Sequence, residues 1–373
     1  MKKVVALFLV LVFCLSCVAC GGSSSAQVTD ETSSEEETAG DNSNIDIVLV
    51  VPNTLGDKAF SDMVWRGITL AKETYGLGNI KCIELQGDTS TPVPTLTELS
   101  ESGEWDLIVT GTYSLKEAIV TVATQFPDQK FIVYDTELDY TNGAFPNAVS
   151  YAAMQNEGSF LAGALAALMT ETDTIGFVGG KETTSVSDFL VGYIEGAQYI
   201  NPDITVYTSF IGSFTDTSTA KELALSQYGQ NADIVFAVCS GAGLGVYDAA
   251  KEKGLWAFGV DSDQALILED TDPDAAKQIM TSVVKNLDVI LSDAIGDYID
   301  GTLTFGQHFE VNLAAGGIGL AYNDYYEAAV PEDIRAQVEE IREKIVSGEI
   351  VVGTAIGMDA DTYQALKDSA LNN

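Results

Sequence analysis

The sequence predicts an α/β protein with two lobes, each built as a parallel sheet flanked by helices, that face each other across a cleft. Two stretches far apart in the chain, 45–75 and 173–197, each have the pattern of a strand, a loop and a helix that begins near a Ser-Asp pair. The apolar residues of the second helix recur at helical spacing: Phe189, Leu190, Tyr193, Ile194 and Ala197. A chain of 373 residues is long enough for each of these two units to have its own core.

The net charge excludes several kinds of partner. With 18 basic and 55 acidic residues the formal charge is −37, which leaves little with which to neutralise phosphates. We therefore expect no binding to nucleic acid and no adhesion to an anionic lipid surface through charge. The simplest alternative explanation of the acidity is solubility through mutual repulsion.

The N-terminus has the features of a targeting segment, predicted to span residues 1–19. A basic pair at residues 2–3 precedes an apolar run, 4–15, that is too short to cross a bilayer comfortably. Small residues before Cys20, with Gly and Ser after it, resemble a bacterial lipobox, so we expect cleavage before Cys20 and lipid attachment to its sulfur. The less favoured lipidation sites are Cys14 and Cys17.

An ordinary secretory signal cut after Ala19 is the alternative to a lipid anchor. The next segment, 20–44, is polar and acidic and contains no aromatic residue, which predicts a disordered tether. The remaining cysteines, Cys82 and Cys239, lie in or just after predicted strands and are expected to be buried free thiols. No spacing of ligands typical of zinc occurs, and neither a metal nor a cofactor is predicted.

The order of the predicted elements assigns stretches to the two lobes. Lobe one is predicted at 45–153 and about 286–315, lobe two at 154–285 and about 316–350, and a C-terminal extension at 351–373. Predicted strands of lobe one are 47–51, 80–85, 107–110, 130–134 and a short crossing at 147–153. Predicted strands of lobe two are 174–178, 205–210, 234–238, 256–260 and 279–284. After the chain returns to lobe one, later strand candidates are 308–313 and 317–321.

Four further helices are predicted, three from the spacing of their apolar residues and one from a capping signal at its first turn. Ser114 and Glu117 form a capping box at the beginning of a helix that runs to about residue 126. Further helices are expected at 158–169, after Lys285 and at about 334–345. Because the chain crosses between the lobes more than once, the lobes should rotate about a hinge without separating.

Candidate ligand-binding residues are those that follow the predicted strands, because ligands of open parallel sheets bind beyond the carboxyl ends of the strands. Those of lobe one are Asn53, Asp57, Lys58, Phe60, Tyr113 and Asp135. Those of lobe two are Phe214, Gly241, Gly243, Asp261, Asp263 and, at a crossing, Lys285. Several carboxylates with few ammonium groups suit a neutral ligand rich in hydroxyl groups and would repel a phosphate.

Two phenylalanines, Phe60 and Phe214, could hold a flat ring between them, although each could equally be a packing residue. Asp57 could equally be a turn or helix-cap residue, whereas Asp135 and Asp261 directly follow apolar strands and are favoured as ligand contacts.

A glycine-rich turn, 240–245, followed by Asp261 imitates a dinucleotide-binding fingerprint. Its spacing is G-x-G-x-G instead of G-x-G-x-x-G, and it lies deep in the chain, so a tight turn before a helix is favoured. The single histidine, His308, lies in a strand-like run and is expected to be structural. Without a nucleophile elbow, a P-loop or a metal cluster in the sequence, the chain is not predicted to be an enzyme.

At these residues the sequence resembles the basic membrane protein family, the substrate-binding lipoproteins of ABC importers that include purine nucleoside receptors. The matching runs are GDKAFSD (56–62), NEGSFLAGALAA (156–167), IGFVGGKE (175–182), GYIEGAQYINPDI (192–204), GSFTD (212–216), KELALSQYGQNADIVF (221–236), SGAGLGVYDAAKE (240–252), FGVDSDQ (258–264), TSVVKNLD (281–288) and GGIGLA (316–321).

The resemblance implies a two-lobed type I periplasmic-binding fold that closes on a nucleoside. By that resemblance, the base would stack between Phe60 and Phe214 and meet Asp135. The ribose would be held by Asp261 or Asp263, with Gly241 and Lys285. This chain departs from the family pattern at Val51-Pro52-Asn53 and at Ser61-Asp62, where the nucleoside binders usually carry Asp and Asn, so the identity of the base stays open.

These observations together predict a lipid-anchored, extracytoplasmic receptor on the cell membrane that captures a nucleoside, delivers it to an ABC permease and acts as a monomer. A receptor for a sugar or another polyol, a ligand sensor for a signalling partner, and an enzyme acting on a nucleoside are the alternatives.

Overall fold

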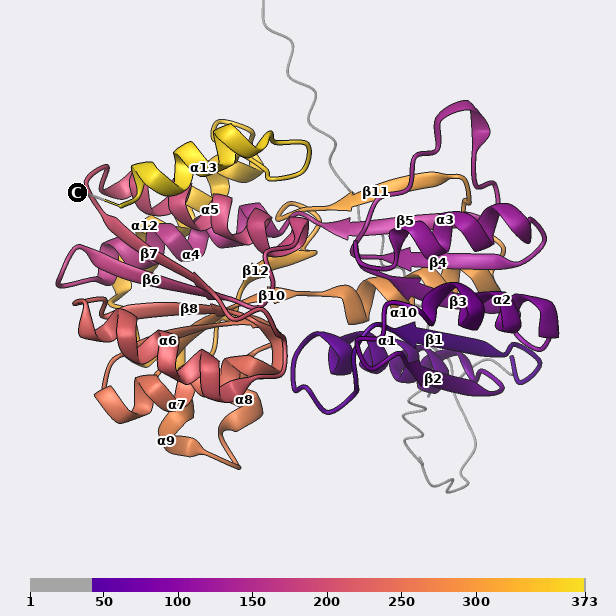
Figure 1. The fold of residues 1–373 in the computed structure, drawn as a ribbon, viewed down its shortest axis with the longest axis horizontal. Coiled ribbons are helices and arrows are strands. Elements are labelled where there is room, and N and C mark those ends of the chain that lie inside the picture. Colours follow the sequence, from indigo (N-terminus) through magenta and orange to yellow (C-terminus); the bar gives the residue numbers. More distant parts are fainter. Residues whose placement is uncertain (1–41, 372–373) are drawn as a thin grey trace, which may run out of the picture. The chain divides into compact units, whose positions relative to one another are not determined.

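The computed structural model describes residues 42–371, which contain two six-stranded sheets. The first sheet and the helices packed on it form the first lobe, and the second sheet and its helices form the second lobe (Figure 1). The α/β fold with two parallel-sheet lobes that the sequence predicts is therefore confirmed.

The first sheet is entirely parallel, and its strands are ordered β11-β5-β4-β3-β1-β2. Strands β1, β3 and β4 in its centre are apolar and almost fully buried, as expected where helices cover both faces. The strands are β1 (Ile47–Val51), β2 (Ile80–Glu84), β3 (Leu107–Gly111), β4 (Lys130–Tyr134), β5 (Ala148–Ala153) and β11 (Gln307–Val311).

Four helices cover the first sheet, two on each face. Helices α1 (Phe60–Tyr75) and α10 (Leu287–Ile299) pack on the face that carries Leu49, and they also pack against each other. Helices α2 (Pro92–Ser102) and α3 (Lys116–Gln125) pack on the face that carries Val50. Helix α10 comes late in the chain, so the core of the first lobe combines two distant parts of the sequence.

The second sheet has the order β12-β10-β9-β8-β6-β7 and is parallel except for β12. Its strands are β6 (Thr174–Gly179), β7 (Thr205–Phe210), β8 (Ile234–Val238), β9 (Trp256–Asp261), β10 (Ile279–Lys285) and β12 (Ile318–Leu320). Phe236 lies at the centre of its core, with its ring within 5.2–6.4 Å of four other aromatic rings, those of Phe177, Phe189, Tyr193 and Phe258.

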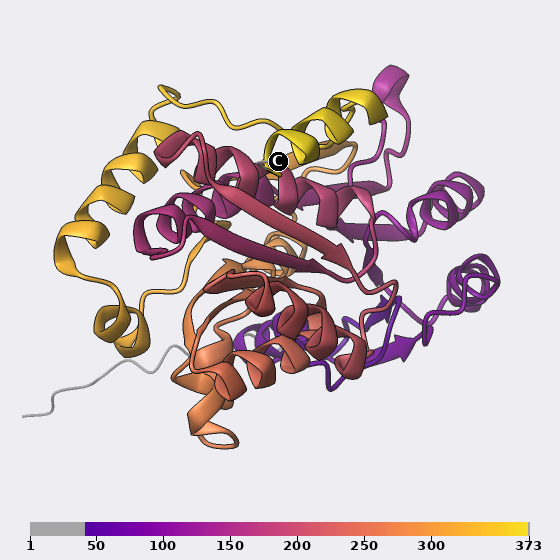
Figure 2. The ribbon, with the colours of Figure 1, turned by 60° about the vertical axis from the view of Figure 1, so that its left-hand side comes forward.

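Helices again cover both faces of this sheet. One face packs against α4 (Gln155–Met169), α5 (Thr184–Ile200) and α12 (Glu332–Val346), with α13 (Ala360–Ser369) beside α5 in Figure 2. The other face packs against α6 (Thr217–Gly229), α7 (Gly243–Lys253), α8 (Gln264–Leu268) and α9 (Pro273–Ala276). A short helix, α11 (Asp324–Ala329), follows β12.

Three connections between the lobes lie side by side and are hydrogen-bonded to one another. They follow β5 at Met154, β10 at Asn286 and β11 at residues 312–317. The Met154 N–H donates to the Val311 carbonyl at 3.0 Å, and the Asn286 N–H donates to the Gly317 carbonyl at 3.0 Å. We therefore expect the two sheets to rotate about this bonded trio, which we call the hinge.

Several helix boundaries differ from the prediction. The expected capping box is absent at α3: Ser114 bonds to the Thr112 hydroxyl at 2.7 Å, and the helix begins only at Lys116 with no side-chain cap. Helix α5 begins at Thr184, where Thr183 caps it, instead of at Ser187. Helices α2 and α13 have polar sequences and were not predicted.

The signal peptide, Cys20 and most of the tether lie outside the described residues. The end of the predicted tether is described: Asn42 pairs with Leu77, and its side-chain amide donates to the Tyr75 carbonyl at 2.7 Å. The packed body therefore includes the last residues of that segment. Between residues 42 and 371, no helix combines the length and the apolar character needed to cross a bilayer.

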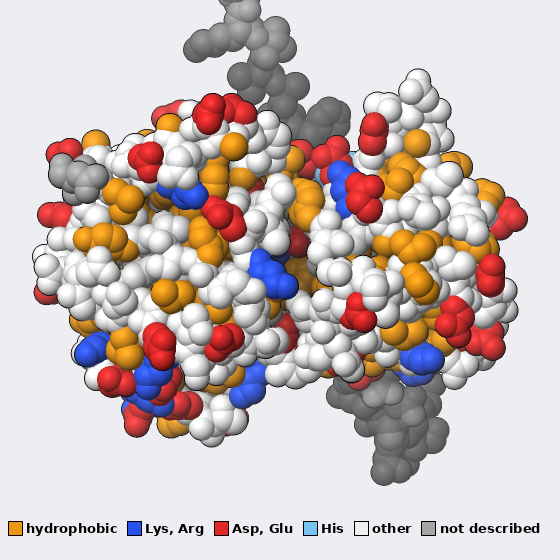
Figure 3. Space-filling view, in the orientation of Figure 1, with side chains coloured by type: hydrophobic (Ala, Val, Ile, Leu, Met, Phe, Trp, Pro, Cys, Tyr) orange, Lys and Arg blue, Asp and Glu red, His pale blue; other side chains and the backbone are white. Residues whose placement is uncertain are grey.

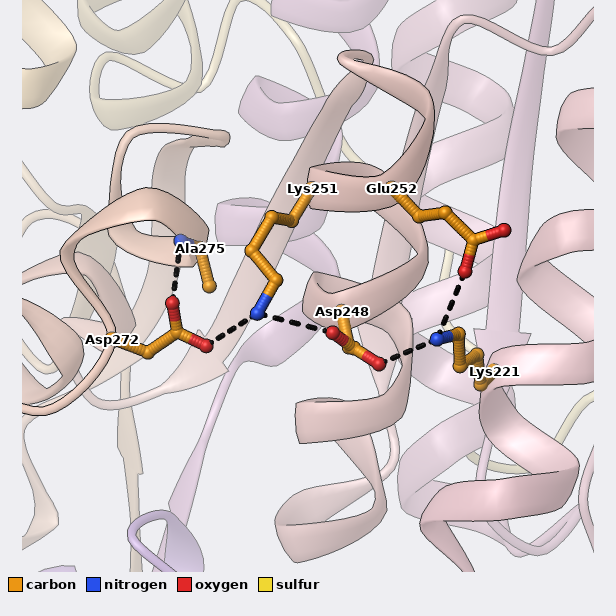
Figure 4. A network of polar contacts seen from close by, with 6 residues as sticks. All are labelled: Lys221, Asp248, Lys251, Glu252, Asp272 and Ala275. Atoms are coloured by element: carbon orange, nitrogen blue, oxygen red, sulfur yellow. Dashed lines mark hydrogen bonds and ion pairs between the residues drawn. The ribbon is translucent and has the colours of Figure 1, made fainter.

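Acidic side chains lie over both lobes on the face shown in Figure 3, and several basic side chains of the described residues form ion pairs with acidic ones. In the network of Figure 4, Lys221 on α6 lies 2.6 Å from Asp248 and 3.0 Å from Glu252, both on α7. Lys251 joins Asp248 to Asp272, which also caps α9 through the Ala275 N–H. These exposed pairs add little stability each.

Candidate functional site

A cavity lies between the lobes at the carboxyl ends of both sheets. It contains about 1050 Å³ of space outside the protein atoms, part of which is open solvent. The elements of both lobes contribute to its wall: Pro52, Asn53, Phe60, Leu85, Gly87, Asp88, Thr89, Pro92, Thr112, Tyr113, Ser114, Leu115 and Asp135 come from the first lobe, and Lys181, Thr183, Ser185, Val186, Phe189, Phe214, Val238, Ser240, Asp261 and Lys285 from the second. This size and position suit a small molecule held by both lobes.

Four residues in this wall lie at or just after the end of a strand and have a backbone in the left-handed region. They are Thr112 (φ 78°), Asp135 (φ 52°), Ser240 (φ 53°) and Asp261 (φ 67°). Such conformations are unfavourable for residues other than glycine, and they concentrate where side chains must be directed to a ligand.

Asp135 and Lys285 form a buried ion pair across the cavity floor. The Lys285 ammonium lies 2.7 Å from the Asp135 carboxylate, and the two side chains are only 2% and 7% exposed. Lys285 also lies 5.0 Å from the centroid of the Phe189 ring and 5.6 Å from that of Phe60. The pair joins β10 of the second sheet to the end of β4 in the first. Because Lys285 is the only buried lysine among the described residues of the cavity wall, the pair neutralises the only buried positive charge there.

Asp261 is a second buried carboxyl group in the wall, on the opposite lobe from Asp135. Burial raises its pKa from the usual range to about 7; Lys285 opposes this rise, and the charges of Asp135 and Asp57 add to it. Near neutral pH this group can therefore accept hydrogen bonds from hydroxyl groups as a carboxylate, or donate one as an acid.

Aromatic rings enter the cavity from both lobes. Phe60 begins α1 and packs its ring at a tilt against Tyr134, 6.0 Å between centroids. Phe214 is held by the turn after β8, since its carbonyl accepts from the Ala242 N–H at 2.9 Å. The Phe214 ring lies against Gly180, where any side chain would collide with it. One ring therefore enters from the start of α1 and the other from the loop after β7.

Tyr113 adds a hydroxyl group to the same wall. Burial raises the pKa of the phenol, and the carboxylates of Asp135 and Asp188 raise it further, so the hydroxyl stays protonated. The buried Tyr113 oxygen has no hydrogen-bond partner within residues 42–371. A buried hydroxyl without a partner costs stability, and a polar ligand can supply that partner.

The structure brings together seven of the predicted site residues in the cavity wall: Asn53, Phe60, Tyr113, Asp135, Phe214, Asp261 and Lys285. Three others, Asp57, Gly241 and Asp263, lie close by but outside the wall. The Asp57 carboxylate accepts from the backbone N–H groups of α1, and Gly241 lies against Asp57. Asp263 caps α8 and accepts two bonds from Asn323.

Lys58 and Gly243, which were also candidates, are outside the wall too. The sequence interpretation missed Lys181, Ser240 and Phe189. Lys181 follows β6, so applying the strand-end rule to that strand would have found it. Ser240 precedes the glycines of the turn, and Phe189 was assigned only to the apolar face of its helix.

Within the described part of the chain, no group of His, Cys, Asp and Glu side chains is arranged to hold a metal ion. His308 shares a hydrogen bond of 2.8 Å with the Ser150 hydroxyl between two paired strands. Cys239 is buried, Cys82 is half-buried, and neither forms a disulfide.

Two α/β lobes joined by three connections, with a ligand-sized cavity at the strand ends of both, define the type I periplasmic-binding fold. Proteins of this class bind a solute between the lobes. The solved structure of an ABC transporter solute-binding protein from Aeropyrum pernix is similar: the TM-score is 0.77 at 25% identity, over 87% of this chain and 98% of that one.

The sequence of residues 44–355 matches the family described as ABC transporter substrate-binding protein, PnrA-like, and the chain belongs to that family. Basic membrane protein A of Borreliella burgdorferi is 29% identical over 82% of this chain and 87% of its own length. The ABC transporter nucleoside-binding protein BmpA of Lactococcus lactis is 26% identical over 82% of this chain and 88% of its own. The protein is thus a substrate-binding component of an ABC transporter, whose partners are a small solute and a membrane permease.

Proposed function

We propose that this substrate-binding protein captures a nucleoside in the cavity between its lobes and is anchored to the outer face of the cell membrane through a lipid on Cys20. The observation that carries the proposal is the pair of rings, Phe60 and Phe214, that reach the cavity from opposite lobes beside the buried carboxyl groups Asp135 and Asp261. Rings on both sides suit a flat base, and carboxylates suit the hydroxyl groups of a ribose.

Charge argues for a nucleoside over a nucleotide. Of the two ammonium groups in the cavity wall, that of Lys285 is paired with Asp135, and that of Lys181 lies on an exposed side chain. A phosphate beside the Asp135–Lys285 pair would meet the carboxyl groups of Asp135 and Asp261, and the ammonium group there is already paired. The name of the Lactococcus lactis relative, a nucleoside-binding protein, agrees with this choice.

Capture requires only hinge closure. Contacts to both lobes exist only when the lobes are closed, so a ligand that makes them shifts the equilibrium toward the closed state. The permease then receives the closed, loaded protein, and no covalent step is involved.

A thermal-shift screen tests the ligand class. At 100 times its Kd a ligand adds about 2.7 kcal/mol of stability, so at least one of inosine, adenosine, guanosine, cytidine and uridine is expected to raise the Tm by several degrees. The corresponding 5′-monophosphates are expected to leave it unchanged. A rise with AMP but with no nucleoside would contradict the proposal.

Binding is expected to weaken as the pH falls below 7. The ligand hydroxyls bind the ionised form of Asp261, whose pKa is about 7, so binding at lower pH must release a proton, and Kd rises by up to about tenfold per pH unit. Calorimetry at pH 5.5–8.5 measures this, and Asp261→Asn should flatten the profile. A wild-type Kd that is constant between pH 5.5 and 7 would show that Asp261 does not bind as a carboxylate.

The same pKa shift has the opposite effect on the ligand-free protein. The folded state holds the Asp261 proton more tightly than the unfolded state does, so this group stabilises the fold fully below pH 3.8. Its contribution is lost as the pH rises to about 7.

A further inference from the structure

Two hydrogen bonds join the lobes beside the cavity through residues that lie mostly outside its wall. The Ser240 hydroxyl of the second lobe donates to the Asp57 carboxylate of the first at 3.0 Å. The Gln264 side-chain amide of the second lobe donates to the Lys58 carbonyl of the first, also at 3.0 Å. Of these four residues, only Ser240 lies in the cavity wall.

The first-lobe side of this contact is rigid without help from the second lobe. Asp57 accepts hydrogen bonds from the N–H groups of Ala59, Ser61 and Asp62 at 2.9–3.1 Å, which fixes both of its oxygens at the start of α1. Asp62 in turn accepts from the Lys58 N–H at 2.8 Å. The turn therefore presents the Asp57 carboxylate and the Lys58 carbonyl in a fixed geometry.

The second-lobe side is equally well placed. Ser240 has φ 53°, an unfavourable value for a residue other than glycine, and its hydroxyl reaches Asp57 across the gap. Gly241 beside it lies next to Asp57, where an added Cβ would make an ordinary van der Waals contact with that residue. Gln264 is 3% exposed, and its amide also donates to the Val260 carbonyl. Both donors are thus held in place by their own lobe.

We propose that these two bonds, Asp57–Ser240 and Lys58–Gln264, form a closure latch that sets the affinity of the protein without being part of the ligand-binding contacts. Asp57, Lys58 and Gln264 are positioning residues: their bonds form when the lobes meet and break when the hinge opens, whereas the helix-capping bonds of Asp57 persist in both states. The inference rests on the proposed function, since it assigns a way of tuning capture at that same site.

Linkage gives the expected effect. If a ligand binds only the closed state, its apparent affinity depends on the free energy of closing the two lobes. A hydrogen bond that exists only in the closed state lowers this free energy and therefore strengthens the binding of any ligand in the cavity. A hydrogen bond to a charged group is among the stronger ones. Removing the Ser240 hydroxyl should therefore raise Kd by about tenfold, mainly through faster dissociation.

A double-mutant cycle with Ser240→Ala and Asp57→Ala tests the latch, with Kd for inosine and the dissociation rate as readouts. Each single variant should weaken binding, and Ser240→Ala should have no further effect once Asp57 is replaced. If the two effects add, Ser240 acts through the ligand and the latch is overturned. Asp57→Ala also removes a helix cap, so Asp359→Ala is the matched control. Asp359 caps α13 and has no bond to the first lobe, so its loss should lower the stability but leave Kd unchanged.

The latch and the nucleoside proposal fail separately. If wild-type protein binds inosine and the cycle is additive, only the latch is wrong. If inosine does not bind but another nucleoside of the thermal-shift screen does, the cycle is measured with that nucleoside. If none of the five binds, the nucleoside proposal is overturned, and the latch is tested by small-angle X-ray scattering of the ligand-free protein. Asp57→Ala should then have a larger radius of gyration than wild type, and an equal radius overturns the latch.

Discussion

Replacement of Lys285 by Met is expected to lower the free energy of unfolding by about 3–5 kcal/mol. The substitution leaves the Asp135 carboxylate buried, 5% exposed, without the ammonium group that lies 2.7 Å away. An unpaired buried charge is unfavourable because it has lost its hydration without forming a compensating ion pair or hydrogen bond. Urea unfolding of the ligand-free protein measures the change.

Two comparisons separate this effect from a general loss of a lysine. Lys277→Met breaks an exposed pair with Asp274, where the side chains are 63% and 75% exposed, and should change the stability by less than about 1 kcal/mol. Adding Asp135→Asn to Lys285→Met removes the stranded charge and should recover a good part of the loss. Equal effects of Lys285→Met and Lys277→Met would show that the buried pair is not formed in solution.

Phe60→Ala and Phe214→Ala are each expected to raise Kd for a nucleoside by about 5- to 150-fold, because stacking of a base on an aromatic ring contributes about 1–3 kcal/mol. The double variant should bind no nucleoside at accessible concentrations. Isothermal titration calorimetry gives the affinities, and circular dichroism checks that the variants fold.

Phe309→Ala is the control for the loss of a phenylalanine. Phe309 is 39% exposed on β11, where it stacks on Tyr151 outside the cavity wall, so its replacement should leave Kd unchanged. If Phe60→Ala and Phe214→Ala bind a solute as tightly as wild type does, that solute is not held between two rings. The result would instead favour a sugar or polyol as the natural ligand.

The fold could be predicted because its central strands carry an unmistakable signal. The β1 and β8 sequences, IVLVV and IVFAV, are unbroken apolar runs that each follow an Asp, and β3 begins with a third such run, which is what burial on both faces requires. Helix starts were harder to predict. Ser114 and Glu117 have the spacing of a capping box, but the Ser114 hydroxyl instead bonds to Thr112, a local competition that spacing does not reveal.

The place of the cavity in the fold could be predicted from the sequence more fully than the side chains that line it. The strand-end rule pointed to Asp135 and Asp261, which lie in the cavity wall because each stands at the end of an apolar strand. It could not distinguish a carboxylate that points into the cavity from one that turns back to its own helix. Asp57 and Asp263 do the latter, because unsatisfied N–H groups at a helix start attract a nearby carboxylate.

The interleaved connectivity of the lobes restricts how a newly made chain can mature. The first sheet lacks its edge strand β11 until residue 311 has been synthesised, and the face of that sheet beside α1 stays uncovered until α10 is present. In the full chain, Leu291 and Ile295 of α10 share a buried core with Leu49 and Ile68. A fragment ending at Lys285 lacks α10, so Leu49 and Ile68 would become more exposed to water. A version of the first lobe made on its own would therefore need both of its sequence segments, the one that ends with β5 and the one that carries α10 and β11.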